Sequence, residues 1–199
     1  MSHAAAAGHA IGVEPTESPL TPESWGKLGM WIFLAGDAMS FGGLLAGYAA
    51  LRFGDPAWPV PSTILGIGLT AVMTFILICS SVSMVKALSA VRHGDHQRFI
   101  MWILVTAFGG AIFLGCQAYE WTHLIDHGLS TATLFGATFF VLTGFHGLHV
   151  TSGVIYLLVI AALGSRFDAE SNNAVEILGL YWHFVDLVWI LIFTFVYLI

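Results

Sequence analysis

Charged residues are scarce in this sequence. Asp, Glu, Lys and Arg make up 9% of it, against about a quarter in a typical soluble domain. Hydrophobic residues make up 57%, and the mean hydropathy is +0.85. This composition excludes an ordinary water-soluble globular protein and predicts a chain embedded in a lipid bilayer.

Basic residues, cysteines and known catalytic motifs are also few or missing. The net charge is −6 and the basic residues form no stripe, which excludes nucleic acid as an expected partner. Cys79 and Cys116 are the only cysteines, and they are expected near opposite ends of different helices, too far apart for a disulfide or a metal pair. The sequence contains no phosphate-binding glycine motif, no nucleophile elbow and no HExxH zinc motif. The residues alone therefore show no complete catalytic site.

Five long apolar runs occupy most of the chain. Each reaches or exceeds the roughly 20 residues that a helix needs to cross about 30 Å of hydrocarbon. The sequence therefore predicts an all-α fold, a polytopic membrane protein in which residues 25–199 form a bundle of five transmembrane helices. The loops between the runs are short and leave no room for a water-soluble domain. The runs lie at about 28–51, 63–91, 99–121, 131–163 and 177–199.

The N-terminal segment and the basic residues predict the orientation. Residues 1–24 have neither a basic start nor a continuous apolar core, so they do not resemble a cleaved signal peptide and are expected to form a mobile tail. Five of the six basic residues fall on the same side as this tail, and only Arg52 falls on the other. This asymmetry predicts a cytoplasmic N-terminus and an outside C-terminus. The five are Lys27, Lys86, Arg92, Arg98 and Arg166.

Six acidic or histidine side chains interrupt the apolar runs. Ionisable residues inside a membrane are costly and usually face other helices or a wet cavity, so these six are candidate functional positions. Asp37 is expected roughly 15 Å deep, where an ionised group costs about 2.5–3.5 kcal/mol. It should therefore be protonated, or face a polar neighbour or a lipid headgroup. The six are Asp37, Glu120, His146, His149, His183 and Asp186.

The spacing of these residues predicts which of them meet. His146 and His149 are three residues apart and share one helical face, as do His183 and Asp186. Estimated depths place His149 and Asp186 in a common polar layer, so we expect one hydrogen-bonded network to include both. Glu120 is expected near the outer interface, apart from that network, where it meets headgroups and water or makes a specific lipid or partner contact.

Two further patterns concern packing and ligands. Gly43 and Gly47 have the GxxxG spacing that lets a neighbouring helix approach closely. The intramembrane polar residues can cross-link helices by hydrogen bonds worth about 0.6–2 kcal/mol each. Two alternatives remain open: a zinc, iron or copper site, or a b-type haem between two helices, either of which would make the chain a transporter or an electron carrier. The metal alternative would use His146, His149, His183 and Asp186.

Four ordered segments carry a family resemblance. They are "LGMWIFLAGDAMSFGGLLAGYAALR", "QAYEW", "GATFFVLTGFHGLHVTSGVIYL" and "YWHFVDLVWILIFTFVYL". Together they are similar to subunit III of haem–copper terminal oxidases, in the short five-helix form of bo-type quinol oxidases and several bacterial cytochrome c oxidases. The chain departs from long-form members at Gly36-Asp37, where those commonly have Ser-Glu, which shortens the acid by one methylene.

The resemblance implies an accessory subunit of a proton-pumping oxidase in the bacterial inner membrane. Such a subunit packs against catalytic subunit I and subunit II, which hold haem and copper, and binds neither cofactor itself. It supports proton uptake, binds phospholipid and protects the catalytic centre. Cytochrome c oxidase is favoured over quinol oxidase, and an accessory subunit of nitric oxide reductase is a further alternative.

The resemblance also implies roles for the six polar positions. None is expected to be catalytic, cofactor-binding or metal-ligating, and all six are expected to serve structure, lipid contact or proton movement. His146 and His149 in particular are expected to belong to a buried hydrogen-bond network that fixes their helix against its neighbours.

Overall fold

A computed structural model describes residues 25–167 and 172–199, so the expected N-terminal tail lies outside the described residues. The described part is all-helical and has no strand. Five helices are long and apolar enough to cross a membrane, which confirms the predicted fold class. They are α1 (Trp25–Gly54), α3 (Ile67–Arg92), α4 (His96–Asp126), α5 (Leu134–Ala162) and α6 (Asn173–Ile192), joined by the short α2 (Pro61–Ile64) and η1 (Gly164–Arg166) and extended by η2 (Phe193–Leu198).

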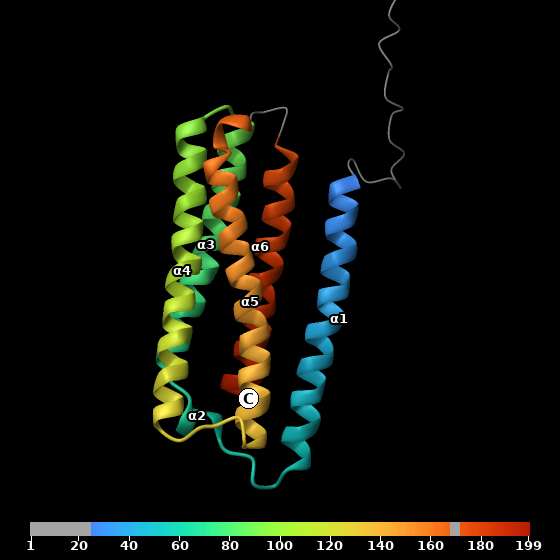
Figure 1. The fold of residues 1–199 in the computed structure, drawn as a ribbon, viewed down its shortest axis with the longest axis vertical. Helices are drawn as coiled ribbons and strands as arrows, with labels where there is room; N and C mark the ends of the chain where they lie inside the picture. The colour runs from blue at the N-terminus through green and yellow to red at the C-terminus, as the bar shows by residue number, and fades with distance from the viewer. Residues whose placement is uncertain (1–24, 168–171) are drawn as a thin grey trace, which may run out of the picture.

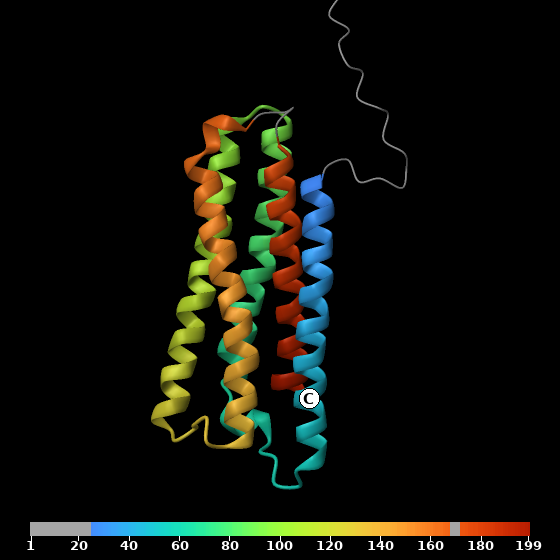
Figure 2. The same cartoon turned by 45° about the vertical axis from the view of Figure 1, so that its right-hand side comes forward.

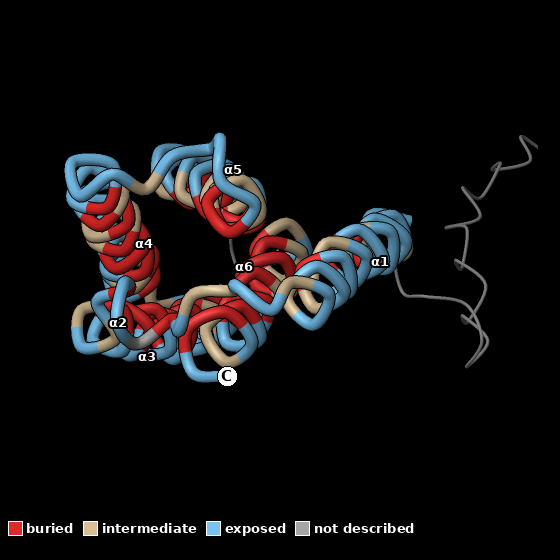
Figure 3. The backbone as a smooth tube through the Cα atoms, turned by 90° about the horizontal axis from the view of Figure 1, so that it is seen from below, coloured by how far each residue is buried: buried red, intermediate tan, exposed pale blue. Residues whose placement is uncertain are grey.

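Four of the long helices form one group and α1 stands outside it. Figure 1 and Figure 2 show α3, α4, α5 and α6 side by side, with α1 alongside α6. Seen from below in Figure 3, the four helices enclose the buried residues, whereas α1 is exposed over most of its surface. Helix α1 contacts α6 and, to a lesser extent, α5.

Helix boundaries differ from the sequence prediction in two places that matter for the site. The run expected at 63–91 is broken at Leu65 and Gly66, so that the short α2 precedes α3. Helix α4 continues to Asp126, five residues beyond the expected end. Glu120 therefore lies six residues before the end of the helix, and its side chain is 4% exposed. The expectation that headgroups and water meet its carboxyl group is wrong, because side chains of the protein enclose that group.

The core of the four-helix group is built from tryptophan packed against small residues. Trp182 lies against Gly110 of α4 and Gly153 of α5. Its indole Nε1 donates to Ser80 Oγ of α3 at 3.0 Å, and Trp189 Nε1 donates to Thr74 Oγ1 at 2.8 Å. Because hydrocarbon offers no hydrogen-bond partners, the hydroxyl groups of α3 satisfy donors that would otherwise be buried unpaired.

Helix α1 is held to the group by a narrow apolar stripe. Its buried residues are Leu34, Phe41 and Tyr48, spaced by seven residues and so on one face. A Cβ atom added at Gly43 or Gly47 would meet nothing within 4 Å, so the GxxxG pattern does not serve packing within the described part of this chain.

Polar contacts at three levels reinforce this stripe. At one end Lys27 Nζ lies 2.5 Å from Glu176 Oε2 of α6, and Arg92 of α3 binds the other oxygen of the same carboxylate. At the opposite end Arg52 donates to the backbone carbonyl of Ile199. The pair between Asp37 and α5, described below, lies between these two ends.

We expect Gly110→Ala to lower the stability of the folded subunit by about 1–3 kcal/mol, because a new methyl group overpacks the core. The Cβ atom would lie 2.6 Å from Trp182 Cη2 and 2.7 Å from Val154 Cγ2, and the indole is fixed by its hydrogen bond. Gly115→Ala on the same helix is the matched control, because its Cβ would meet nothing within 4 Å. The midpoint of thermal unfolding should fall for the first variant and stay or rise for the second. Equal midpoints would contradict the packing.

Candidate functional site

Asp37 of α1 and His149 of α5 form a pair within the membrane-spanning part of the bundle. The distance between Asp37 Oδ2 and His149 Nε2 is 3.2 Å, and the side chains are only 14% and 13% exposed. The ring of Phe41 covers the imidazole, with centroids 5.1 Å apart. The expectation that Asp37 faces a polar neighbour is therefore confirmed, and the neighbour is a histidine of another helix.

The second nitrogen of His149 also has a hydrogen-bond partner. His149 Nδ1 lies 2.8 Å from the carbonyl oxygen of Phe145, and because a carbonyl only accepts, Nδ1–H must be the donor. The other ring nitrogen makes the contact with Asp37, so both nitrogens of His149 have a partner and the buried carboxyl group is not left alone.

The backbone around this pair is also fixed by hydrogen bonds. Tyr181 of α6 donates its hydroxyl to the carbonyl oxygen of His149 at 3.0 Å, and Ser152 Oγ lies 2.6 Å from the same phenol oxygen. Helices α1, α5 and α6 therefore meet at this level, where two hydroxyl groups lie at the backbone of His149.

Glu120 forms a second buried cluster, on α4. Thr70 Oγ1 of α3 lies 3.1 Å from Glu120 Oε1. Tyr197 donates to Oε2 at 2.8 Å, and Gln117 Nε2 donates to the same oxygen at 3.2 Å. Tyr197 is brought into reach by the π-helical segment η2, in which it is 1% exposed. Neutral partners from three elements therefore hold the carboxyl group. This cluster links the ends of those elements to one another.

His183 and Asp186 of α6 share a neighbour, as their spacing predicts. His183 Nδ1 lies 3.2 Å from Ser81 Oγ of α3, and Ser81 and His183 both interact with the Asp186 carboxyl group. Among the described residues no hydrogen bond joins this group to His149 or Glu120. The expected separation of Glu120 is confirmed, whereas the expected common network of His149 and Asp186 is wrong.

His146 does not join a hydrogen-bond network, which corrects a second expectation. Its side chain is fully buried, and neither ring nitrogen has a hydrogen-bond partner among the described residues. It stacks on Trp189 with ring centroids 4.9 Å apart, and the ring of Phe113 meets it edge-on at 5.7 Å. The reason is that residue 146 faces the aromatic interior of the four-helix group, whereas residue 149, 300° further round the helix, faces α1.

The four residues of the metal alternative do not converge. His149 is paired with Asp37, and His146 packs among aromatic rings. His183 lies next to Ser81 and Asp186. In residues 25–167 and 172–199, no group of three or more His, Cys, Asp and Glu side chains is arranged to hold a metal ion.

Several partners in these clusters are not recognisable from the sequence. Tyr197 and Thr70 are ordinary residues of apolar runs, and only the packing of η2 and α3 against α4 brings them to Glu120. The abundance of Ser and Thr between Ile67 and Arg92 is the one available signal, since α3 supplies a hydroxyl partner to α4 and to α6.

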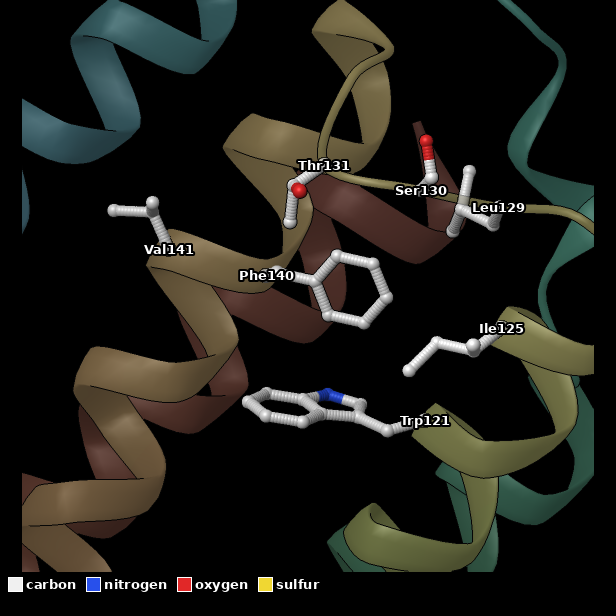
Figure 4. A pocket seen from close by; sticks show the side chains of 7 residues that line it. All are labelled: Trp121, Ile125, Leu129, Ser130, Thr131, Phe140 and Val141. Atoms are coloured by element: carbon white, nitrogen blue, oxygen red, sulfur yellow. The ribbon is translucent and has the colours of Figure 1, made fainter.

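An apolar groove of about 500 Å³ lies at the end of the bundle where α4 stops and α5 begins. Figure 4 shows the indole of Trp121 below the ring of Phe140, with Ile125 and Leu129 beside them. The two rings are perpendicular, with centroids 5.3 Å apart. Only the hydroxyl groups of Ser130 and Thr131 bring polar side chains to its lining. The groove suits an acyl chain better than a polar ligand.

Comparison with known proteins identifies the family. Residues 25–199, which include every described helix, match the family model of cytochrome c oxidase subunit III. The chain belongs to this family. It is therefore a multi-pass membrane protein and subunit III of a haem–copper terminal oxidase, a complex with partner subunits I and II.

The chain resembles subunits of cytochrome c oxidases and of quinol oxidases. The cytochrome c oxidase subunit 3 of Synechocystis sp. is 42% identical over 175 residues, which cover 86% of this chain and 74% of the relative. The quinol oxidase subunit 3 of Bacillus spizizenii is 36% identical over 174 residues, 86% of this chain and 85% of the relative. The cytochrome c oxidase subunit 3 of Corynebacterium diphtheriae is 37% identical over 179 residues, 87% of each chain.

We predict that Tyr197→Phe destabilises the subunit by about 1–3 kcal/mol, because it removes a donor from the buried Glu120 carboxyl group. The matched control is Tyr119→Phe, since Tyr119 is a neighbour of Glu120 in sequence but is 63% exposed. That control should change stability by no more than about 0.5 kcal/mol. Thermal unfolding of the purified complex, followed by loss of subunit III, measures both. If the two variants unfold alike, the phenol does not support Glu120.

Proposed function

We propose that this chain is the accessory, non-catalytic subunit III of a proton-pumping cytochrome c oxidase in a bacterial inner membrane. It binds no haem or copper itself and supports proton uptake, lipid binding and stability of catalytic subunit I. The family match over residues 25–199 carries this proposal. It is supported by the ionisable groups within the helices, which are held in separate clusters and not gathered as a ligand set.

The electron donor of the partner subunits is proposed to be cytochrome c. The 42% identity to a cytochrome c oxidase subunit exceeds the 36% identity to a quinol oxidase subunit. Quinol oxidase is the second candidate, favoured by the coverage of 85% of that relative. The difference in identity is small because subunit III does not carry the donor site in either proposal.

The proposed orientation has the N-terminus in the cytoplasm. Residues Lys27, Lys86, Arg92 and Arg98 lie near the ends of α1, α3 and α4 that meet at one end of the bundle, and Arg52 lies at the other. Positive charge is retained on the cytoplasmic side during insertion, so this end is assigned to the cytoplasm.

Lipid binding is proposed for the groove between α4 and α5. Its lining is almost wholly apolar, and a volume of about 500 Å³ suits part of an acyl chain. A lipid held there would fill the space between Trp121 and the loop before α5, and so tie the ends of the two helices together. This is the structural support that we assign to the lipid.

A proton-related role is proposed for Asp37. Its carboxyl group contacts the His149 imidazole of a second helix within the membrane-spanning part of the bundle, and the Ser152 and Tyr181 hydroxyl groups lie near the His149 backbone. It is a supporting position for the delivery of protons to the partner subunit and takes no part in oxygen chemistry.

Purification of the native complex through this chain tests the assignment. We expect subunit I, a subunit II with a dinuclear copper centre, and oxygen consumption driven by reduced cytochrome c. Subunit III separated from the complex should contain less than one iron, copper or zinc ion per chain, and His149→Ala should not change that content. A complex that oxidises quinol and lacks dinuclear copper would favour the second candidate, and stoichiometric metal in the separated chain would overturn the accessory role.

Replacement of Asp37 by Asn and by Ala separates packing from proton chemistry. Asn can donate its amide hydrogen to His149 Nε2, so it keeps the hydrogen bond but loses the exchangeable proton, whereas Ala loses both. We expect the Asn complex to assemble and its turnover at alkaline pH, where protons are scarce, to fall about twofold, far less than the 10²–10⁴-fold of a catalytic acid. Ala should also weaken assembly. Unchanged turnover of the Asn variant at every pH would leave Asp37 with a packing role only.

A further inference from the structure

A basic hollow lies at the opposite end of the bundle from the groove of Figure 4. It is formed where α3 ends and α4 begins, on the hairpin that Figure 1 shows on the far side of the group from α1. Its volume is about 440 Å³. Lys86, His93 and Arg98 bring cationic or protonatable groups to the lining, and Asp95 is its only acidic residue; Ser89, Ala90 and Trp102 complete it.

The acidic residue of this hollow is already engaged. Asp95 caps α4 by accepting the backbone N–H of Arg98 at 3.0 Å, and its other oxygen lies 3.3 Å from Arg98 Nε. Lys86 has no carboxylate within 4.0 Å among the described residues, whereas Lys27 and Arg92 at the same end share Glu176. Lys86 is thus a cation that faces the hollow without an anion among the described residues.

The depth of Lys86 places this charge at the level of lipid headgroups. Lys86 lies six residues before the end of α3 and Trp102 six residues after the start of α4, each roughly 9 Å along its helix. The Lys86 ammonium sits 4.5 Å from the centre of the Trp102 ring. A lysine that extends along its helix and a tryptophan beside it are typical of the membrane interface.

The surface below the hollow is apolar and exposed. Val82 and Val85 on α3, and Met101 and Val105 on α4, are each between 45% and 55% exposed. A molecule seated in the hollow therefore meets positive charge at its head and hydrocarbon surface along its tail. Basic hollows between transmembrane helices on the cytoplasmic side suit anionic phospholipid headgroups.

We propose that the end of the α3–α4 hairpin binds the phosphate of an anionic phospholipid of the cytoplasmic leaflet, with Lys86 as its cation, the Asp95-paired Arg98 beside it and Trp102 as a wall. The site is separate from the groove of Figure 4. It deepens the proposed lipid role and rests on the proposed orientation only for the choice of leaflet. A lipid bound there would attach the ends of α3 and α4 to the membrane surface. These two helices have the most extensive contact with each other in the described part of the chain.

Native mass spectrometry of the intact, delipidated oxidase complex tests the site. Phosphatidylglycerol is titrated in, and the lipid adducts on the complex are counted for each variant. Lys86→Met keeps the length of the side chain and removes its charge, and should weaken one adduct about fivefold, as expected for one cation at a membrane surface. Arg166→Met, which removes a cation from the same end but not from this hollow, should leave that adduct unchanged.

Two further titrations distinguish the source of the phosphate. Phosphatidylcholine should bind the wild-type site more weakly and should not respond to Lys86→Met, and inorganic phosphate should not displace the lipid. Equal binding of both lipids, displacement by phosphate, or an unchanged adduct in Lys86→Met would each overturn the proposal. These outcomes are independent of the donor and cofactor content of the complex, so failure here is distinguishable from failure of the proposed function.

Discussion

The structure depends on one constraint: hydrocarbon cannot hydrogen-bond to a polar group, so a polar side chain among the helices is stabilised only by a partner within the protein, on its own helix or on another. The indole nitrogens of Trp182 and Trp189 are satisfied by hydroxyl groups of α3, and Glu120 by α3, α4 and η2. Apolar packing alone does little to fix the rotation of one helix against another. These hydrogen bonds are directional, so they favour one arrangement of the helices. The hydroxyl-rich α3 is therefore the element against which α4 and α6 are aligned.

His146 shows how the interior treats a polar ring that has no such partner. It is enclosed by aromatic side chains and stacks on Trp189, whose own nitrogen donates elsewhere. An unsatisfied polar group costs about 1–3 kcal/mol, and stacking returns part of this, typically about 0.5–1.5 kcal/mol for an aromatic pair. The same helix turn thus carries two histidines of different character, because only His149 has a carboxylate within hydrogen-bond distance.

The number of helices and their spans follow from the sequence, because length and hydropathy alone decide whether a segment can cross a bilayer. The polar positions also follow, since a charge such as Asp37 within an apolar run is conspicuous. Their partners do not follow, because estimated depth is a single coordinate and the rotation of each helix is set by packing. The estimated depths of His149 and Asp186 are similar, but the rotation of α5 about its axis directs His149 toward Asp37. The hydrogen bond from Tyr197 to Glu120 could not be predicted either, because it depends on the π-helical turn that brings Tyr197 inward.

The attachment of α1 explains how one helix can be part of the subunit and still be largely exposed. A stripe of three buried residues provides little apolar contact, and the face with Gly43 and Gly47 touches nothing in the described chain. Its orientation is therefore set in part by the polar contacts at Lys27, Asp37 and Arg52, which lie at three heights along the helix. Two contacts would leave the helix free to pivot about the line that joins them, whereas three at different levels resist both tilt and rotation. Because the middle contact is the only one within the hydrocarbon, it is the least screened by water and salt. The contact between Asp37 and His149 therefore also sets how firmly α1 is held against α5.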